Sequence, residues 1–264
     1  MTSNRPLALV TGASSGIGAD LARELARNGH DLVLTARRAE PMRALADELR
    51  AFGAASIVIA SDLSKPDAAP VLIADLESRA LVPDVLVNNA GLGAGGPFHE
   101  SDPARVCEML YVNVVALTEL TRLLLPAMVA KKSGRVLLVA STAAFQPGPS
   151  MAVYCASKAY VLSFGEAIAY ELRGSGVTVT VLCPGPTHTG FTEVAKTGSS
   201  ALFESPVASV MTSAEVARQG YRAMAAGKRV HITGMMNKLV AASGRFSPHA
   251  ISLPVTEAIL KPGN

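Results

Sequence analysis

A serine, a tyrosine and a lysine in the middle of the chain have the types and spacing for proton transfer. Ser141 follows an apolar run, 135–140, and Tyr154 and Lys158 stand four residues apart at the front of a helical pattern. That spacing is about 6 Å of rise and nearly one full turn, so both side chains share a helix face. We expect the Lys158 ammonium to lower the pKa of Tyr154, which then exchanges a proton with a carbonyl oxygen oriented by Ser141. The alternative is a chance pair on an ordinary helix.

A glycine-rich turn near the start of the chain has the context of a phosphate-binding loop. The apolar run 7–10 leads into TGASSGIG, residues 11–18, and a helical pattern ending at Asn28 follows. Glycines at these positions permit a tight turn, close approach of a pyrophosphate and close packing of helix against strand. The alternative is a glycine turn that binds nothing. We assign to the cofactor Gly12, Ser14, Ser15, Gly16, Ile17 and Gly18.

The end of the second strand pattern, 31–36, indicates which dinucleotide is bound. Ala36 lies about 20 residues past Gly16, where a NAD-binding unit has an Asp or Glu for the ribose hydroxyls. Arg37 and Arg38 follow it. Guanidinium groups suit a 2′-phosphate, so the sequence predicts NADP(H). A solvated basic helix start is the other interpretation.

Two more strand patterns end in residues that suit a cofactor. Asp62 and Leu63 follow the pattern 56–60, and Asp62 is placed to reach an adenine amino group. The pattern 85–87 runs into NNAG, residues 88–91, where small residues let a cofactor lie against the sheet edge and the amides tie strands together. From this segment we assign Asn89, Ala90 and Gly91.

A long helical pattern, 103–128, carries Asn113 in its middle. A polar amide in an apolar helix is usually a satisfied core contact. It could equally hold a water that carries protons to Lys158. The sequence is compatible with both interpretations.

Strand patterns alternate with helical ones along the whole chain, at 7–10, 31–36, 56–60, 85–87, 135–141, 177–183 and 230–233. We therefore predict one α/β domain over 1–264, a doubly wound, mostly parallel Rossmann-type sheet of about seven strands with helices on both faces. A helix from 151 to 173 should carry the Tyr-Lys pair, and a capping box at Thr212 and Glu215 should open another. Residues 186–211 are expected to be the substrate loop, and 234–264 a short, mostly apolar tail.

Charge, cysteine spacing and hydropathy argue against a nucleic-acid-binding, metal-binding or membrane-spanning protein. A net charge of +3 is too small and too dispersed to indicate nucleic-acid binding. The cysteines, Cys107, Cys155 and Cys183, lack metal-ligand spacing, so we expect inert, reduced core thiols and no metal. The first apolar run is too short for a signal peptide and no run is long enough to span a membrane, so we expect a cytoplasmic protein.

Taken together, these motifs resemble the short-chain dehydrogenase/reductase family over residues 7–233, in the family's order and spacing. The resemblance implies that Tyr154 is the acid/base, Ser141 orients the substrate oxygen, Lys158 binds the ribose and tunes Tyr154, and Asn113 completes a proton relay. It also implies cofactor contacts from Pro184, Gly185, Thr187 and Thr189, although Thr187 stands where valine or isoleucine is common. The tail resembles that of bacterial short-chain oxidoreductases with undefined substrates. In this family the helices that correspond to 103–128 and 151–173 usually pair across a subunit interface. The resemblance therefore implies a dimer or tetramer.

The sequence thus predicts an NADP-dependent oxidoreductase, a carbonyl reductase of an apolar small molecule. The substrate expectation depends on the loop, whose bulky residues are Phe191, Phe203, Val207 and Met211 and which has no arginine clamp for an anion. These side chains could instead only pack the loop. The alternatives are a catalytically silent cofactor-binding regulator or scaffold and an NAD-linked alcohol dehydrogenase, and Arg37 argues against the second of these.

Overall fold

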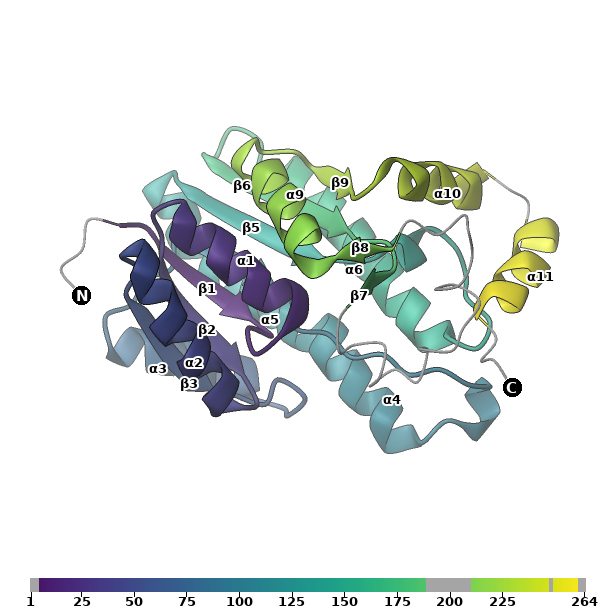
Figure 1. The fold of residues 1–264 in the computed structure, drawn as a ribbon, viewed down its shortest axis with the longest axis horizontal. Helices are drawn as coiled ribbons and strands as arrows, with labels where there is room; N and C mark the ends of the chain where they lie inside the picture. Colours follow the sequence, from purple (N-terminus) through teal and green to yellow (C-terminus); the bar gives the residue numbers. More distant parts are fainter. Residues whose placement is uncertain (1–4, 189–209, 247–248, 261–264) are drawn as a thin grey trace.

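The structure is a computed structural model that describes residues 5–188, 210–246 and 249–260. Its central sheet has seven parallel strands in the order β3-β2-β1-β4-β5-β6-β9 (Figure 1). The order reverses between β1 and β4, as in a doubly wound sheet, and the predicted fold class is confirmed. The strands are β1 (Leu7–Thr11), β2 (Asp31–Ala36), β3 (Ser56–Ala60), β4 (Val85–Asn88), β5 (Gly134–Val139), β6 (Val177–Cys183) and β9 (Val230–Ile232).

Helices cover both faces of the sheet (Figure 1). On one face lie α1 (Gly16–Arg27), α2 (Ala39–Leu49) and α9 (Ser213–Ala225). On the other lie α3 (Ala68–Ser78), α4 (Pro103–Leu110), α5 (Leu117–Lys131) and α6 (Ala152–Glu171). Alternate strand residues supply the two cores: Leu9 packs into one of them, and its neighbours Ala8 and Val10 pack into the other.

The inner strands of the sheet could be predicted from the sequence because almost all of their residues are buried. Every residue of β1 and β4 is buried, and β2 and β6 are buried except at one position each. Parallel strands covered on both faces give near-continuous apolar runs rather than alternating ones. The bounds of β2, β3 and β6 agree with the sequence prediction residue for residue.

The predicted helix 103–128 is not uniform. A π-helical turn, Tyr111–Ala116, separates α4 from α5, so the helical run extends from 103 to 131 with a wider turn around Asn113. In the described part of the chain this run is the one helix long and apolar enough to cross a membrane. That is weak evidence for a span, because α5 packs buried side chains such as Leu120 and Leu124 into the core.

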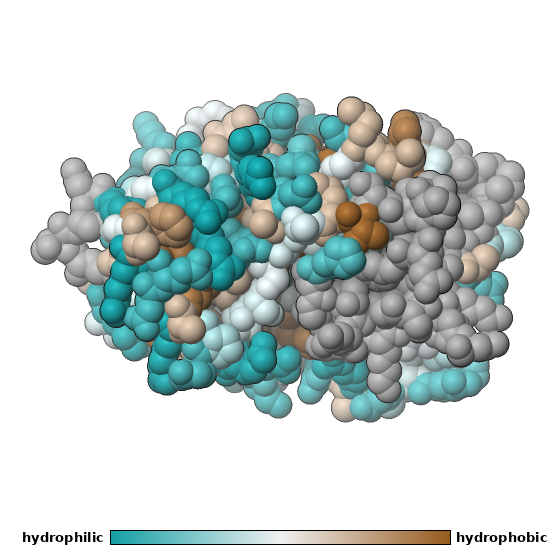
Figure 2. All heavy atoms as spheres, in the orientation of Figure 1, coloured by the Kyte–Doolittle hydropathy of each residue, from teal (hydrophilic) through white to brown (hydrophobic). Residues whose placement is uncertain are grey.

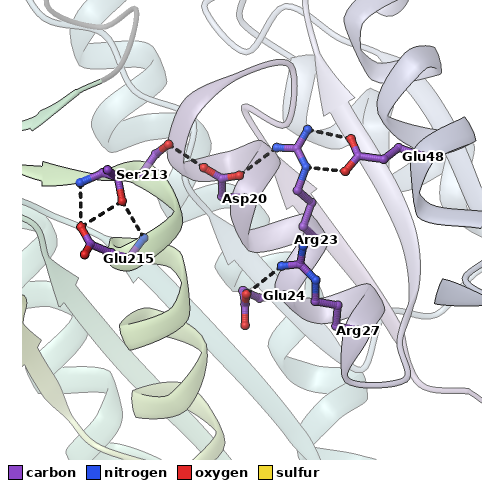
Figure 3. Close-up of polar contacts among 8 residues, drawn as sticks. Asp20, Arg23, Glu24, Arg27, Glu48, Ser213 and Glu215 are labelled. Atoms are coloured by element: carbon purple, nitrogen blue, oxygen red, sulfur yellow. Dashed lines mark hydrogen bonds and ion pairs between the residues drawn. The ribbon is translucent and has the colours of Figure 1, made fainter. Parts of the chain in front are cut away.

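Polar contacts bind the three helices of the first layer to one another (Figure 3). Ser213 Oγ at the start of α9 donates to Asp20 Oδ2 of α1 at 2.5 Å, and Arg23 donates to the other oxygen of Asp20 at 2.8 Å. Arg23 also gives two N–H groups to Glu48 of α2, each at 2.8 Å. Because these groups are partly exposed, each ion pair stabilises the fold by at most about 1 kcal/mol. The outer side of this layer is largely hydrophilic (Figure 2).

The predicted capping box at the start of α9 is confirmed. Thr212 Oγ1 accepts from Glu215 N at 3.3 Å, and the Glu215 carboxylate accepts from Thr212 N at 3.1 Å. Just before it, β8 (Met211–Thr212) pairs with β7 (Thr187–His188), so both ends of the predicted substrate loop return to one place. Residues 189–209 between them, with Phe191, Phe203 and Val207, lie outside the described residues.

The tail differs from the prediction of a short apolar segment. It forms α10 (Met235–Phe246) and α11 (His249–Leu260), which extend from the end of β9 along the right side of the molecule (Figure 1). The alternation of strand and helix patterns ends before residue 234. The sequence pattern therefore did not predict two more helices in the tail.

Candidate active site

The turns that follow β1, β4, β5 and β6 meet at the carboxyl edge of the sheet. The Asn89 side chain contacts the glycine loop, and the next residues lead to Gly91, where an added Cβ would lie 3.4 Å from Lys158 Nζ. Lys158 Nζ in turn donates to Val139 O at the end of β5. Because the strands are parallel, motifs from distant parts of the chain lie side by side.

Thr11 and Asn89 join the glycine loop to β4. Thr11 Oγ1 accepts from the backbone N–H groups of Asn89 and Ala90, each at 3.0 Å. The Asn89 amide donates to Thr11 O at 3.0 Å and to Gly12 O at 3.2 Å. An added Cβ on Gly18 would lie 2.3 Å from both Asn89 Nδ2 and Gly12 O, so only glycine fits there. Asn89, assigned to the cofactor, therefore holds the loop through its side chain.

The start of α1 lies in the glycine loop. Ser15 is the N-cap residue, and its side chain makes no capping hydrogen bond. The first backbone N–H groups of a helix lack acceptors within the helix and lie at its positive end, and here they belong to Gly16, Ile17 and the buried Gly18. This arrangement fits a pyrophosphate, the group for which the loop was predicted. Ser14 is half-buried in the loop, and Ser15 is exposed.

The residues assigned to the adenosine end lie beyond β2 and β3. Arg37 and Arg38 are exposed, with Arg38 at the N-cap of α2. Burial raises the pKa of Asp62, but hydrogen bonds from Ser64 and the charge of Arg37 outweigh it, and the pKa falls below its usual value. The charge of Arg37 therefore acts on the Asp62 carboxylate. Leu63 is buried beside them.

Lys158 is a buried ammonium group. Its side chain is 4% exposed, and Nζ donates to Val139 O at 2.9 Å. Burial lowers the pKa of Lys158 to about 8. The group is therefore charged at neutral pH, and it has three protons of which the Val139 carbonyl takes one. The other two suit the hydroxyls of a ribose.

The expectation that Lys158 lowers the pKa of Tyr154 is wrong. Burial raises the pKa of Tyr154 to about 12, and a hydrogen bond with Ser141 only partly opposes this effect. Lys158 Nζ lies 5.8 Å from the centre of the Tyr154 ring and donates to a backbone carbonyl. The phenolate is thus poorly solvated, and the tyrosine is held in its protonated form.

Ser141 stands at the end of β5 as predicted, where it caps the 3-10 turn Thr142–Phe145. Its Oγ accepts from Ala143 N at 3.1 Å and lies 3.5 Å from Pro184 O. The hydroxyl donates to Pro184 O over this long distance, and a closer oxygen could take the same proton. With its hydrogen bond to Tyr154, Ser141 can orient a substrate oxygen beside the phenol.

The side chain of Asn113 is a satisfied core contact, one of its two interpretations. Its Oδ1 accepts from Leu92 N at 2.8 Å, and its Nδ2 donates to Leu92 O at 2.9 Å and to Ser157 Oγ at 3.0 Å. Ser157 Oγ donates to Tyr154 O at 2.7 Å. Asn113 thereby positions both the loop after Gly91 and the helix of Tyr154. Ser157 was not among the predicted site residues. The only feature of the sequence that could have indicated it is its position next to Lys158.

The turn after β6 contains the remaining predicted contacts. Pro184 and Gly185 follow Cys183 directly, and Thr187 Oγ1 donates to Gly185 O at 2.9 Å. The Thr187 side chain thus stabilises the turn, and the departure from the usual valine or isoleucine has this local use. Thr189 lies outside the described residues.

A cavity of about 560 Å³ lies on the opposite side of α6 from this edge. Ala156 of α6 lines this cavity. Because Ala156 is two residues away from both Tyr154 and Lys158, its side chain lies on the opposite face of the helix from theirs. The cavity contains no catalytic side chain and is not the catalytic cleft. Its other lining residues are Ala144, Phe145, Gln146, Pro147, Gly148, Pro149, Ala152, Cys155, Ala159 and Leu253.

Two of the three cysteines match the expectation of core thiols. Cys155 and Cys183 are buried, and burial raises the pKa of Cys155 to about 11 and that of Cys183 to about 12. Cys107 is exposed, contrary to expectation, because it lies on the outer side of the short helix α4. No cluster of potential metal ligands occurs among the residues that the structure describes.

Comparison with known proteins agrees with this geometry. A family model for short chain dehydrogenases matches residues 6–199. A short chain dehydrogenase of Pseudocercospora fijiensis is 39% identical over 180 residues, which cover 67% of this chain and 58% of that protein, less than two thirds of its length. Ketoacyl reductase HetN of Nostoc sp. (strain PCC 7120) is 32% identical over 250 residues, covering 92% of this chain and 85% of that protein.

A solved structure agrees as well. A short-chain dehydrogenase from Sphingobium yanoikuyae, in complex with NADPH, matches with a TM-score of 0.80 at 31% identity and covers 90% of this chain and 92% of its own. The family model spans the glycine loop, Ser141, Tyr154 and Lys158. The chain therefore belongs to the short-chain dehydrogenase/reductase family of oxidoreductases.

Proposed function

We propose that this protein is an NADP-dependent carbonyl reductase that acts on an apolar small molecule. The observation that carries the proposal is the meeting of Tyr154, Ser141 and Lys158 beside the glycine loop at one sheet edge. The nicotinamide, when bound, supplies or accepts a hydride, and the chain supplies position and a proton.

Each catalytic side chain has a task that its surroundings support. Tyr154, with a pKa of about 12, keeps its proton at neutral pH and can give it to the oxygen of a carbonyl that is being reduced. Ser141 donates a hydrogen bond to the same oxygen. Lys158 holds the ribose hydroxyls and sets a positive charge near the developing negative charge. Asn113 positions the helix of Tyr154 through Ser157, and its second proposed task is to hold a water that carries protons to Lys158.

Arg37 and Arg38 favour NADP over NAD as the cofactor. They are exposed at the end of β2, where a guanidinium can pair with a 2′-phosphate in two parallel hydrogen bonds. The position before them is Ala36, so no carboxylate there repels a phosphate. The NADPH bound to the Sphingobium relative supports the same choice. These features argue against the NAD-linked dehydrogenase.

An apolar carbonyl compound is the substrate class that fits best. The relative from Nostoc is named as a ketoacyl reductase, and a keto group on an acyl chain belongs to this class. Apolar surface gains about 25 cal/mol per Å² on burial, so efficiency should rise with the apolar size of the substrate. The intact pair Tyr154 and Lys158 argues against a silent regulator or scaffold.

We also propose that the protein works as a dimer or tetramer in the cytoplasm. Large apolar side chains remain exposed on the helical run 103–131 and on α6, namely Leu110, Leu123, Val129, Tyr160 and Tyr170. Burying them against a second copy would remove this surface from water. Sedimentation velocity at micromolar concentration should therefore give a dimer or larger species, and a single monomer boundary would contradict the assembly.

The proposed reaction is tested with NADPH and a series of methyl ketones of increasing chain length. We expect kcat/KM to rise with chain length, because each buried methylene contributes about 0.8 kcal/mol. Tyr154→Phe should abolish turnover while leaving NADPH affinity nearly unchanged, since only the proton donor is removed. A polyol ketone that outperforms the series would contradict the apolar pocket. Substantial turnover by Tyr154→Phe would remove Tyr154 from its role.

The pKa of Lys158 predicts how cofactor binding depends on pH. Lys158 is charged below pH 8 and neutral above it, because its pKa is about 8, whereas Tyr154 stays neutral up to about pH 12. NADPH affinity, measured by fluorescence titration between pH 7 and 10, should therefore fall as the pH rises through 8. Tyr154→Phe should keep this pH dependence, and Lys158→Arg should lose it. A flat profile for the unmodified protein would contradict the assignment.

Arg37 predicts the preference between cofactors. A charge-assisted hydrogen bond to a phosphate should favour NADPH over NADH by roughly ten- to a hundred-fold, and Arg37→Asp should reverse that preference. The measurement is the ratio of dissociation constants for the two cofactors. Arg43→Asp, an equal charge change on the exposed side of α2, is the control and should leave the ratio unchanged. An equal effect of both variants would mean that only net charge matters.

A further inference from the structure

A buried carboxamide of the C-terminal helix α10 lies directly on the turn after β6. Asn237 is 3% exposed, although it stands near the start of a helix whose neighbouring residues, Met235 and Met236, are exposed. An added Cβ on Gly185 would lie 2.2 Å from Asn237 Nδ2, 2.4 Å from its Cγ and 2.6 Å from its Oδ1. The whole amide group is therefore seated against the Cα of Gly185.

This contact gives the reason for glycine at position 185. Gly185 is not among the glycines of the described residues that have left-handed φ angles, so its backbone conformation would accept another residue. The obstacle is the neighbouring side chain, which any Cβ would overlap. Gly185 is thus a seat for Asn237, in addition to being part of the Pro-Gly turn.

Hydrogen bonds fix Asn237 to the end of the sheet. Thr233 N donates to Cys183 O at 3.3 Å, which continues the pairing of β9 with β6 by one residue. Gly234, with a φ of 78°, then turns the chain into α10. Asn237 Nδ2 donates back to Thr233 O at 2.9 Å. The amide is therefore held from the β9 side and contacts Gly185 on the β6 side.

The same face of α10 reaches the turn that follows Ser141. Asn237, Ala241 and Gly244 are spaced four and three residues apart and are all buried, so they form one face of the helix. An added Cβ on Gly244 would lie 2.8 Å from Gln146 Oε1 and 3.3 Å from Phe145 O. One helix thus packs against the segments that follow both β5 and β6.

We propose that Asn237 is a positioning residue for the nicotinamide end of the cofactor site. By seating its amide on Gly185, it fixes the Pro184–Pro186 turn relative to the segment that follows Ser141, so the C-terminal helix takes part in aligning the cofactor with the catalytic residues. The inference rests on the proposed function in that a nicotinamide is held at this edge. It gives the tail a role that neither its composition nor the glycine loop implies.

The test compares a whole cofactor with a fragment that lacks the nicotinamide. Asn237→Ala should weaken NADPH binding by about tenfold and change the affinity for adenosine 2′,5′-bisphosphate by less than about twofold. Ser243→Ala is the matched control, because Ser243 Oγ also donates to a carbonyl of α10, Val240 O at 2.8 Å, but is exposed. It should change neither affinity. Equal changes for both ligands, including no change, would overturn the proposal.

A second experiment tests the contact itself and remains informative if one variant is unstable. Gly185→Ala should weaken NADPH binding and lower the thermal unfolding temperature, because the added methyl overlaps the amide. In the Asn237→Ala background the three overlapping atoms are gone, so the same substitution should cost much less in both measurements. If Gly185→Ala is equally damaging in both backgrounds, Asn237 does not position the turn.

These outcomes are separable from failure of the proposed function. If no ketone is reduced, the proposed reaction fails. The changes in affinity for NADPH and for adenosine 2′,5′-bisphosphate caused by Asn237→Ala still test the role of Asn237. If the unmodified protein binds NADH and not NADPH, the cofactor choice fails, and the same comparison is made with NADH and adenosine 5′-monophosphate.

Discussion

The active-site edge depends on keeping an ammonium group charged inside the protein. Moving such a group out of water costs several kcal/mol unless hydrogen bonds compensate. The Val139 carbonyl at the end of β5 provides one such bond to Lys158. For this hydrogen bond α6 must lie very close to the sheet. Gly165 permits the close packing, because a Cβ at that position would lie only 2.3 Å from Val181 Cγ2. The packing of one helix thus sets the electrostatics of the site.

The same burial gives Tyr154 and Lys158 opposite changes in pKa. Removing water disfavours the charged form of each group, so the phenol becomes a weaker acid and the ammonium a stronger one. Both groups nevertheless keep their protons at neutral pH. A protonated phenol beside a charged ammonium is the arrangement that reduction of a carbonyl needs, because the phenol must donate and the ammonium must stabilise negative charge.

Around this pair, hydrogen bonds between polar groups hold the surrounding segments in place. Thr11 and Asn89 join the glycine loop to β4, and Asn113 joins the loop after Gly91 to the helix of Tyr154 through Ser157. Buried networks of this kind rigidify a site when every member is satisfied. Asn113 lies within the π-helical turn between α4 and α5 and accepts from Leu92 N there.

The sequence by itself determined the sheet and the residues at its edge. Strands such as β2 and β6 could be found because burial on both faces leaves a continuous apolar run, and the glycine loop because its context is local. Only the tertiary structure decided the direction of the pKa change at Tyr154, the satisfied state of Asn113 and the reason for glycine at 185. Each depends on atoms far away in the chain: desolvation is a sum over all neighbours, and the amide that excludes a side chain at Gly185 comes from residue 237, in a helix outside the strand–helix alternation.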